Sequence, residues 1–496
     1  MATRATETER KFRIEDGQQV PDLSELVRLG ETERHRLQAV YYDTPDLLLA
    51  RNRRTLRRRT GGNDAGWHLK LPGDGDSRTE VGLPLTTGSA ARLVPTALRE
   101  QVTDIIGAAP LVPVLELRTN RTETQLTGPR GGSLAMLCDD KVTAVRRGEE
   151  RSWRELEVEL TRGTVELLDR ITARFAEAGV PVSESVSKLV QALGEQLAEA
   201  DRPARPRKAS AAQVIGAHLA DQVGVIQNRE ADVRADVPDS VHKMRVATRR
   251  LRSALRTFRA LMDREVTDQL RAELKWLAGM LGAPRDAEVL REQLRGELNE
   301  LPADSVIGPV AERIENTLDE QHRRAHRELV KALDSARFSR LATSLLDLVT
   351  DPPFTDYAGA RAKGVLPELL GRVDRRVAKA WRRARGLEGA EAEEAWHLTR
   401  KRAKAARYAW EASIDVCGDE AAAIAGAWEQ VTETLGVVQD CVVIRERLRE
   451  LAEAATAAGE SSFTYGVLHQ RLVEREESAR GAAVAALKAA RKLSNA

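Results

Sequence analysis

Charged side chains that recur at every second residue are the first feature of the sequence that could do chemistry. Glu7, Glu9 and Lys11 alternate within TETERKF, so all three share one face if this segment is a strand. The same alternation recurs in Arg57 and Arg59, in Arg78 and Glu80, and in Glu155, Glu157 and Glu159, while Lys70 ends the segment WHLK. Carboxylate oxygens are ligands for Mg²⁺ or Mn²⁺, and cationic side chains bind phosphate. If a sheet closes with these faces inward, its lumen holds an acidic wall and a basic wall, which a metal-bridged phosphate chain would neutralise together.

A second set of charges rises along two predicted helices. At offsets of 0, 3, 7 and 10 residues the first helix carries His242, Arg245, Arg249 and Arg252, and the second carries His397, Arg400, Lys404 and Arg407. At about 100° per residue, these offsets fall within an arc of roughly 80°. Each helix therefore presents one stripe, about 15 Å long, of cationic or hydrogen-bonding side chains.

Neither stripe has an acidic residue within its own segment, residues 242–259 or 397–410. Like charges therefore repel along each helix, and an extended anion would relieve the repulsion. Nucleic acid is disfavoured because single-strand binders offer aromatic platforms, and only Tyr408 and Trp410 lie beside the stripes. A phosphate chain without bases fits better, since a histidine can donate a hydrogen bond to a phosphate oxygen in either protonation state.

The elements that must position these residues divide the chain near residue 200. Before it, period-two segments cut by Gly, Pro and Asp predict antiparallel strands, with one helix at about Thr164–Ala178. After it, Ala, Leu, Arg and Glu recur with helical periodicity. A Pro- and Arg-rich stretch separates the two regions. We predict an α+β domain over residues 1–200, a linker over 201–210 and an all-helical domain over 211–490.

The helical part repeats itself. The two stripe histidines lie 155 residues apart, and each is followed by an LGxxxD motif whose Asp is 44 or 43 residues further on. The motifs contain Leu281, Gly282 and Asp286 in the first half, and Leu435, Gly436 and Asp440 in the second. We expect the motif to close the second helix after the histidine-bearing one. The repeat predicts a double four-helix bundle with pseudo-two-fold symmetry.

The overall composition excludes several classes of protein. The chain has 78 basic and 76 acidic residues, a net charge of +2, so the anionic ligand is predicted from local segments and not from bulk charge. A run of about 18 apolar residues is absent, which argues against a membrane span. Cys138, Cys417 and Cys441 lack paired spacing, which argues against a disulfide scaffold or a zinc finger. The N-terminus lacks the apolar stretch of a secretory signal, so we expect a cytoplasmic protein.

The motifs HxxRxxxRRLR and HxxRxxxKxxRY, each followed by LGxxxD, resemble the conserved-histidine α-helical domain, CHAD, over about residues 211–490. The resemblance implies a double four-helix bundle associated with inorganic polyphosphate. It implies that polyphosphate is bound by His242, Arg245, Arg249, Arg252, His397, Arg400, Lys404 and Arg407. One departure stands out: fourteen residues after the histidine, the first half has Arg256 and the second has Glu411.

The motif ExExK, followed in order by YYDT, LRRR, WHLK, RTE, RELEVEL and SKL, resembles the CYTH superfamily of triphosphate tunnel metalloenzymes over about residues 1–200. The resemblance implies an eight-stranded antiparallel β tunnel with helices outside. It implies metal binding by Glu7, Glu9, Glu157 and Glu159, with Glu80 and Asp140 as further acidic positions. It implies triphosphate binding by Lys11, Arg57, Arg59 and Lys70, with Lys188 as a further basic position. In LRTNRTE the two arginines are three apart, so the choice of Arg118 or Arg121 as the lumen residue stays open.

These features predict a divalent-metal-dependent hydrolase of inorganic tripolyphosphate, joined to a helical domain that binds long-chain polyphosphate. Mg²⁺ or Mn²⁺ is the expected cofactor, and the expected catalytic residues are Glu7, Glu9, Lys11, Glu157 and Glu159. The same tunnel could instead cyclise ATP, as class IV adenylyl cyclases do, or hydrolyse thiamine triphosphate or nucleoside triphosphates. An alternative of another kind is a non-catalytic polyphosphate-binding or granule-associated protein. No membrane partner is expected.

Overall fold

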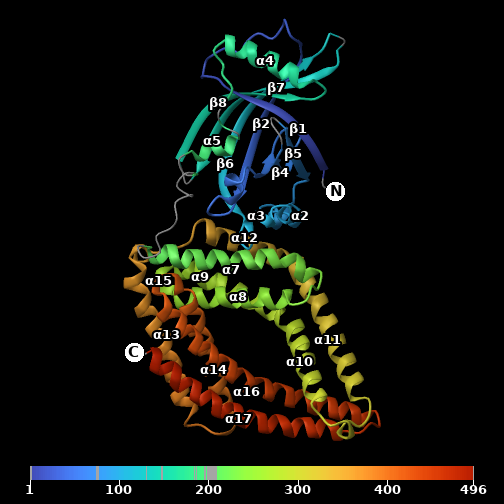
Figure 1. Cartoon of the computed structure of the whole chain (residues 1–496), viewed down its shortest axis with the longest axis vertical. Helices are drawn as coiled ribbons and strands as arrows, with labels where there is room; N and C mark the ends of the chain where they lie inside the picture. The colour runs from blue at the N-terminus through green and yellow to red at the C-terminus, as the bar shows by residue number, and fades with distance from the viewer. Residues whose placement is uncertain are drawn as a thin grey trace. The chain divides into compact units, whose positions relative to one another are not determined.

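The structure is a computed structural model that describes residues 3–73, 77–129, 131–146, 149–183, 185, 187–194, 197 and 209–494. The chain divides into two compact units, Met1–Pro203 and Ala204–Ala496 (Figure 1). Residues 201–208, which make up most of the predicted linker, lie outside the described residues.

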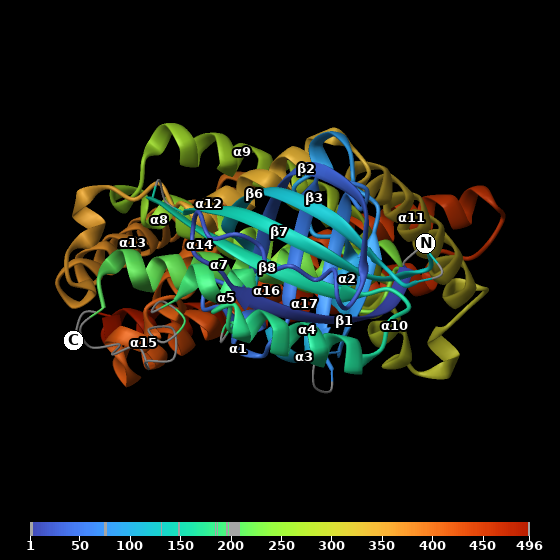
Figure 2. The same cartoon turned by 90° about the horizontal axis from the view of Figure 1, so that it is seen from above.

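The first unit is built around a closed barrel of antiparallel strands. The strands are β1 (Thr3–Arg13), β2 (Arg28–Asp43), β3 (Thr55–Thr60), β4 (Gly66–Pro72), β5 (Ser77–Leu83), β6 (Val112–Thr127), β7 (Ser133–Arg146) and β8 (Glu149–Leu160). Their order around the barrel is β1-β5-β4-β3-β2-β6-β7-β8, and β8 pairs with β1 to close it. Figure 2 shows β6, β7 and β8 lying side by side. The predicted eight-stranded antiparallel barrel is confirmed.

Strand β8 turns apolar side chains outward and charged ones inward. On β8, Leu156 and Val158 are fully buried in a cluster that they share with helix α4 (Val165–Glu177). Because neighbouring residues of a strand point to opposite faces, Glu157 between them faces the interior. Helix α4 confirms the helix predicted at about Thr164–Ala178.

The remaining helices of this unit are short. They are α1 (Leu48–Arg51), the 3₁₀ helix η1 (Gly88–Ala90), α2 (Thr96–Glu100), α3 (Thr103–Ile106) and α5 (Lys188–Leu193). On α5, Leu189 and Leu193 join a buried cluster with Leu117 of β6. Leu117 lies four residues before Arg121 and so shares its face of the strand. Helix α5 therefore packs against the inner face of the barrel and carries Lys188 with it.

The second unit is all helical, as predicted. Its helices are α7 (Ala211–Arg234), α8 (Ser240–Thr257), η3 (Arg259–Leu261), α9 (Arg264–Met280), α10 (Gly282–Asn299), η4 (Ala303–Ser305), α11 (Val310–Leu333), α12 (Ala336–Thr350), η5 (Asp356–Gly359), α13 (Ala362–Ala384), α14 (Gly389–Glu411), α15 (Ile414–Cys417), α16 (Asp419–Ala457) and α17 (Phe463–Ser494). None of the helices in the described ranges is long and apolar enough to cross a membrane.

The two repeats begin alike and share their cores. The residues that precede α7 and α13 form an antiparallel bridge, Ser210 with Arg361, and the histidine-bearing helices α8 and α14 contact each other. One core joins α7, α8, α9, α12, α13 and α14 to parts of α16 and α17. A second core joins α10 and α11 to the other parts of α16 and α17. The halves therefore interlock across two shared cores.

The LGxxxD motif takes two different positions. In the first half Leu281 is the junction between α9 and α10, so the motif follows the first α-helix after α8. In the second half Leu435 and Gly436 lie inside the 39-residue α16, which runs continuously where the first half has two helices. The expectation that the motif closes the second helix after the histidine-bearing one is therefore wrong.

Candidate functional sites

The inner face of the barrel brings together charged residues from seven strands. Strand pairing places Glu9 beside Glu159, Lys11 beside Glu157, and Lys70 beside Glu80. Residues that are directly opposite each other in an antiparallel pair share a face of the sheet. By this criterion the predicted residues on the inner face are Glu7, Glu9, Lys11, Arg57, Arg59, Lys70, Glu80, Arg121, Asp140, Glu157 and Glu159.

Glu157 is the centre of an ion-pair network. Its carboxylate contacts the ammonium of Lys11, lies 2.7 Å from the Arg121 guanidinium and 2.6 Å from the Lys188 ammonium, and its side chain is 8% exposed. Burial alone would raise the pKa of Glu157, but the three cations outweigh it and hold that pKa well below its usual range. Glu157 is therefore a fixed anion that positions cations from β1, β6 and α5.

An acidic triad surrounds this centre. Asp140, Glu155 and Glu157 offer ligand oxygens that all lie within 4.8 Å of one another, a geometry that could hold a metal ion. The ammonium of Lys188 lies 3.0, 2.7 and 2.6 Å from their respective oxygens, and these carboxylates raise its pKa although burial opposes them. The charge of the triad is thus met by a lysine. Glu155 was not among the predicted site residues, although its alternation with Glu157 in RELEVEL marked the shared face.

A second acidic group is less well neutralised. Glu7 contacts Lys70, and Glu9 lies 3.5 Å from Lys11. Burial, and then the neighbouring Glu7, raise the pKa of Glu159 to about 7. In the described part of the chain, the buried Oε1 atom of Glu9 has no hydrogen-bond partner. The same oxygen lies 3.5 Å from the Lys11 ammonium, and although burial opposes them, Lys11 and Lys70 lower the pKa of Glu9. Glu7, Glu9 and Glu159 offer ligand oxygens of the kind that Mg²⁺ or Mn²⁺ prefers, but among the described residues the group whose oxygens all lie within 4.8 Å of one another is Asp140, Glu155 and Glu157.

Two arginines of β3 form the basic wall. The Nε atoms of Arg57 and Arg59 are buried and lack a hydrogen-bond partner among the described residues. Burial, and then the charge of Arg57, lower the pKa of Arg59 to about 9. Glu80 lies 3.9 Å from Arg57, 3.5 Å from Lys70 and 2.6 Å from the Nδ1 atom of His68. Glu80 is thus held among cations, and the guanidinium groups keep donors free for an anionic ligand.

The structure decides between the two arginines of LRTNRTE. Arg121 lies 2.7 Å from both Asp140 and Glu157 on the inner face. Arg118 is three residues away, and positions an odd number apart on a strand point to opposite faces. Its side chain is 57% exposed and pairs with Glu116 and Glu150, so the inclusion of Arg118 in the triphosphate site is corrected. His68 was missed, although its spacing from Lys70 in WHLK placed the two on one face.

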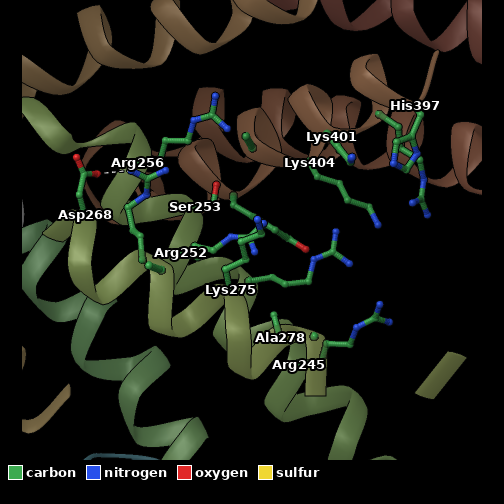
Figure 3. Close-up of a pocket in the computed structure, with 17 residues that line it drawn as sticks. Arg245, Arg252, Ser253, Arg256, Asp268, Lys275, Ala278, His397, Lys401 and Lys404 are labelled. Carbon is green, nitrogen blue, oxygen red and sulfur yellow. Dashed lines mark hydrogen bonds and ion pairs between the residues drawn. The ribbon is translucent and has the colours of Figure 1, made fainter. Parts of the chain in front are cut away.

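In the helical domain the two stripes line one cleft of about 860 Å³ (Figure 3). Its charged and polar lining is Arg245, Arg249, Arg252, Ser253 and Arg256 from α8, Asp268, Arg271 and Lys275 from α9, and His397, Arg400, Lys401, Lys404 and Tyr408 from α14. Asp268 is the one acid among the described lining residues, and it is paired with Arg271. The cleft is therefore strongly cationic.

Six of the eight predicted polyphosphate-binding residues line this cleft, and two do not. Those that do are Arg245, Arg249, Arg252, His397, Arg400 and Lys404. Arg407 is instead paired with Glu411 at 2.7 Å and with Glu429 of α16 at 2.6 Å. His242, at the N-terminal end of α8, is also not among the lining residues. Sequence analysis missed the wall that α9 provides, because Arg271 and Lys275 are mixed with acids in the sequence.

The LGxxxD motif supports the first arginine of each stripe. A Cβ on Gly282 would lie 3.7 Å from the Arg245 guanidinium, and one on Gly436 would lie 3.3 Å from the Arg400 guanidinium. The carboxylate of Asp286 lies 3.1 Å from Arg245. The position of Gly436 is therefore tight against Arg400, a Cβ on Gly282 would make an ordinary contact with Arg245, and Asp286 orients Arg245.

The cleft holds cations that crowd one another. Burial, and then Arg400 and Arg249, lower the pKa of Lys404 to about 7. The Nε atoms of Arg245 and Arg400 are buried and have no hydrogen-bond partner in the described ranges. Free donors in a field of excess positive charge favour an anion with many acceptor oxygens.

Comparisons with known proteins agree with this division of the chain. A family model described as the CYTH domain matches residues 5–192, and one described as the CHAD domain matches residues 217–449. Two curated proteins, each named an uncharacterized protein and each from a strain of Mycobacterium tuberculosis, are 37% identical to the chain over 506 residues, which cover 98% of this chain and 96% of theirs.

Solved structures are more distant. PptA from Streptomyces chartreusis is 20% identical, covering 56% of this chain and all of that chain, with a TM-score of 0.49. The CHAD domain from the plant Ricinus communis is 24% identical, covering 59% of this chain and 97% of that chain, with a TM-score of 0.46. HpAC1 from Hippeastrum, described as having a dominant triphosphatase activity, is 20% identical, covering 40% of this chain and all of that chain, with a TM-score of 0.27.

Proposed function

The chain belongs to the family of proteins that join a CYTH domain to a CHAD domain, and from this premise we propose that it is a divalent-metal-dependent hydrolase of inorganic tripolyphosphate whose helical domain binds long-chain polyphosphate. One observation carries the proposal. The inner face of the barrel carries both carboxylates, among them Glu159 with a raised pKa, and the arginines Arg57 and Arg59, whose buried Nε atoms have no hydrogen-bond partner among the described residues.

In this proposal each wall of the tunnel has its own task. Glu7, Glu9 and Glu159 would hold Mg²⁺ or Mn²⁺, which when bound supplies a Lewis acid for phosphoryl oxygens. Arg57 and Arg59 bind the non-bridging oxygens of the substrate and balance the charge that moves to the leaving group. Lys11 and Lys70, each in contact with a carboxylate of β8 or β1, turn towards the bound phosphates.

Two other predicted carboxylates act through position. Asp140 and Glu157 anchor the cations Arg121 and Lys188, so the basic side of the lumen is fixed before substrate arrives. Preorganised charge needs little rearrangement in the transition state, which is how such a site accelerates phosphoryl transfer. The lumen is therefore suited to bind a short phosphate chain.

The helical domain is proposed to bind polyphosphate in the cationic cleft. The supporting observation is the lining itself, in which cations from α8, α9 and α14 face a single acid among the described lining residues. Tyr408 is the one aromatic side chain among them, so a ligand that needs base stacking is poorly served.

A substrate panel tests the proposed activity. Purified full-length protein is given tripolyphosphate, ATP and thiamine triphosphate in turn, with Mg²⁺, with Mn²⁺ and with EDTA, and phosphate release and cyclic AMP are measured. We expect tripolyphosphate to be hydrolysed fastest and EDTA to abolish turnover. Cyclic AMP as the main product, or faster turnover of either nucleotide or thiamine substrate, would reassign the tunnel. No turnover of any substrate would leave a binding protein.

A further inference from the structure

The two stripes end differently at the point where the sequence repeats diverge. Glu411, at the end of α14, is engaged by Arg250 at 2.8 Å and by Arg407 at 2.7 Å. Its counterpart in the first repeat, Arg256 at the end of α8, has no ion-pair partner among the described residues and lines the cleft. One end of the paired stripes is thus neutralised, and the other stays cationic.

A second hollow begins at this cationic end. It measures about 440 Å³ and shares Arg256 with the cleft. Its charged lining is Arg256 and Arg259 after the stripe of α8, Arg376, Lys379 and Arg383 of α13, and Arg402 of α14. The described lining contains neither an acidic nor an aromatic side chain.

We propose that this hollow is a second phosphate-binding subsite that continues the cleft, so that a long polyphosphate chain leaves the cleft past Arg256 and lies along α13. The inference rests on the polyphosphate binding proposed above and adds a direction and a minimum chain length to it. A ligand short enough for the cleft does not reach the subsite.

The spacing on α13 suits an extended ligand. Arg376, Lys379 and Arg383 follow one another at intervals of three and four residues, so they share a face of the helix. At 1.5 Å per residue this face is about 10 Å long. A smaller hollow continues past Arg376, and its lining includes Arg259 and Arg264. The cationic path is therefore longer than the cleft alone.

The charge of the hollow is not that of an ordinary solvated helix face. Surface arginines of this domain are commonly paired within one turn, as Arg372 is with Glu368 at 2.5 Å. The cations of the hollow have no such partner in the part of the chain that the structure describes. Partial burial, and then Arg402, lower the pKa of Arg256, and the same two causes lower that of Arg376. Crowded cations of this kind are stabilised by a polyanion.

The cleft is also displaced towards this end. On α8 its lining begins at Arg245 and reaches Arg256, whereas on α14 it begins at His397 and ends at Tyr408. On α8 the lining thus starts after the stripe histidine, His242, and extends to Arg256, which the cleft shares with the hollow. This arrangement is expected if the ligand passes from the cleft into the hollow.

The test compares two double variants of the full-length protein. Arg376→Ala with Arg383→Ala removes two exposed arginines from the hollow. Arg324→Ala with Arg327→Ala removes two exposed arginines from α11, which lines neither hollow nor cleft. Net charge changes equally in both. Binding of long-chain polyphosphate and of tripolyphosphate is measured in EDTA over a range of salt concentrations. The tunnel is unaltered in both variants, so its contribution cancels.

We expect the hollow variant to lose roughly tenfold in affinity for long-chain polyphosphate at low salt. The slope of log K against log salt should fall by about 1 to 2, because fewer counterions are released. Tripolyphosphate binding should be unchanged, and the α11 variant should bind both ligands nearly as the unaltered protein does.

Three outcomes would overturn the inference. Equal losses in the two variants would mean a diffuse charge effect. A loss of tripolyphosphate affinity equal to the loss of long-chain polyphosphate affinity would mean that the hollow does not extend the cleft. Single-stranded DNA that competes better than polyphosphate, and loses this advantage in the hollow variant, would mean a nucleic-acid site. Failure of the proposed function is separate: it would appear as intact long-chain binding when Arg245 and Arg400 in the cleft are replaced by alanine.

Discussion

The two domains bury lysines in opposite electrostatic settings. Lys188, inside the barrel, is surrounded by Asp140, Glu155 and Glu157, and these carboxylates raise its pKa well above the usual value against the effect of burial. Lys404, in the helical cleft, is surrounded by arginines, and burial together with these arginines lowers its pKa to about 7. The barrel supplies counterions for most of its charges, whereas the cleft supplies few for its cations.

This difference has consequences for ligand binding. In the barrel, a ligand must replace existing ion pairs, so it must bring both charges, a metal for the carboxylates and phosphate for the cations. In the cleft, most lining cations have no acidic partner, the exceptions among the described residues including Arg245 with Asp286 and Arg271 with Asp268. An anion therefore gains charge pairing at little loss, and its affinity is expected to depend strongly on salt. The barrel is therefore expected to be selective for its ligand, whereas the cleft is expected to bind polyanions less selectively.

Removing carboxylates from the barrel should have the largest effect. Glu7→Gln with Glu9→Gln deletes two charges from the least neutralised acidic group and keeps the side-chain volumes. We expect tripolyphosphate turnover to fall by at least about a hundredfold, because the metal loses its ligands. The melting temperature should change little, because the cost of burying the two carboxylates and their attraction to Lys70 and Lys11 oppose each other.

The measurements are phosphate release at saturating metal and Mg²⁺ or Mn²⁺ binding by calorimetry. The control is Glu25→Gln with Glu31→Gln, two exposed glutamates, which should keep full activity. Full activity with the two lumen glutamates replaced would remove Glu7 and Glu9 from the metal site.

Removing the basic wall of the barrel should separate substrate binding from metal binding. Arg57→Ala with Arg59→Ala should lower kcat/KM by about a hundredfold, because both guanidinium groups contact phosphate in the proposed complex. Metal binding should persist, since neither residue offers a metal ligand. Arg58→Ala, on the opposite face of the same strand, is the matched control and should keep most activity. If metal binding is lost and excess metal restores turnover, the roles of the two walls are reversed.

Removing cations from the cleft should affect only polyphosphate binding. Arg245→Ala with Arg400→Ala takes the supported arginine from each stripe, and we expect affinity for long-chain polyphosphate to fall by roughly tenfold or more at low salt. Tripolyphosphate turnover in the barrel should be unchanged. The α11 pair Arg324→Ala with Arg327→Ala has the same net charge and should retain binding. Equal losses in the two pairs would mean that bulk charge, and not the cleft, attracts polyphosphate.

The barrel could be predicted from sequence as far as strand alternation reaches. Period-two spacing placed Glu7, Glu9 and Lys11 on one face of a strand. In the structure, the residues that pair with them on the neighbouring strands lie on the same face of the sheet. Which carboxylate meets which cation depends on register, for example the contact of Lys11 with Glu157, and register cannot be read from one strand alone. The insertion of Lys188 depends on how α5 packs, which alternation does not describe.

The helical cleft shows the same limit in another form. Helical spacing identified both stripes, but Arg407 does not line the cleft, because it pairs with Glu429 on a different helix. Arg271 and Lys275 line the cleft because α9 packs against α8. Neither residue belongs to a basic run of the sequence. Local periodicity therefore predicts which residues share a face, and tertiary packing decides which faces meet.

The smallest expected effect is the pH dependence of polyphosphate binding, which tests the contrast between Lys404 and Lys188. Lys404 has a pKa of about 7 without ligand, and a bound polyanion stabilises its ammonium and raises that pKa. The complex then holds more protons than the free protein, so affinity is greatest below about pH 7 and falls as pH rises, by at most about tenfold per unit. Burial, and then Lys401, lower the pKa of His397 below its usual value. A bound polyanion favours the protonated form of this histidine as well, so a Lys404 variant is needed to tell the two groups apart. Lys404→Arg keeps the positive charge at every pH tested, so its polyphosphate affinity should vary less between about pH 7 and about pH 9. Calorimetry in two buffers of different ionisation enthalpy measures the proton uptake directly. If Lys404→Arg shows the same pH slope and the same proton uptake as the unaltered protein, Lys404 is not the group that titrates. The cleft would then lack the uncompensated lysine by which we distinguish it from the barrel.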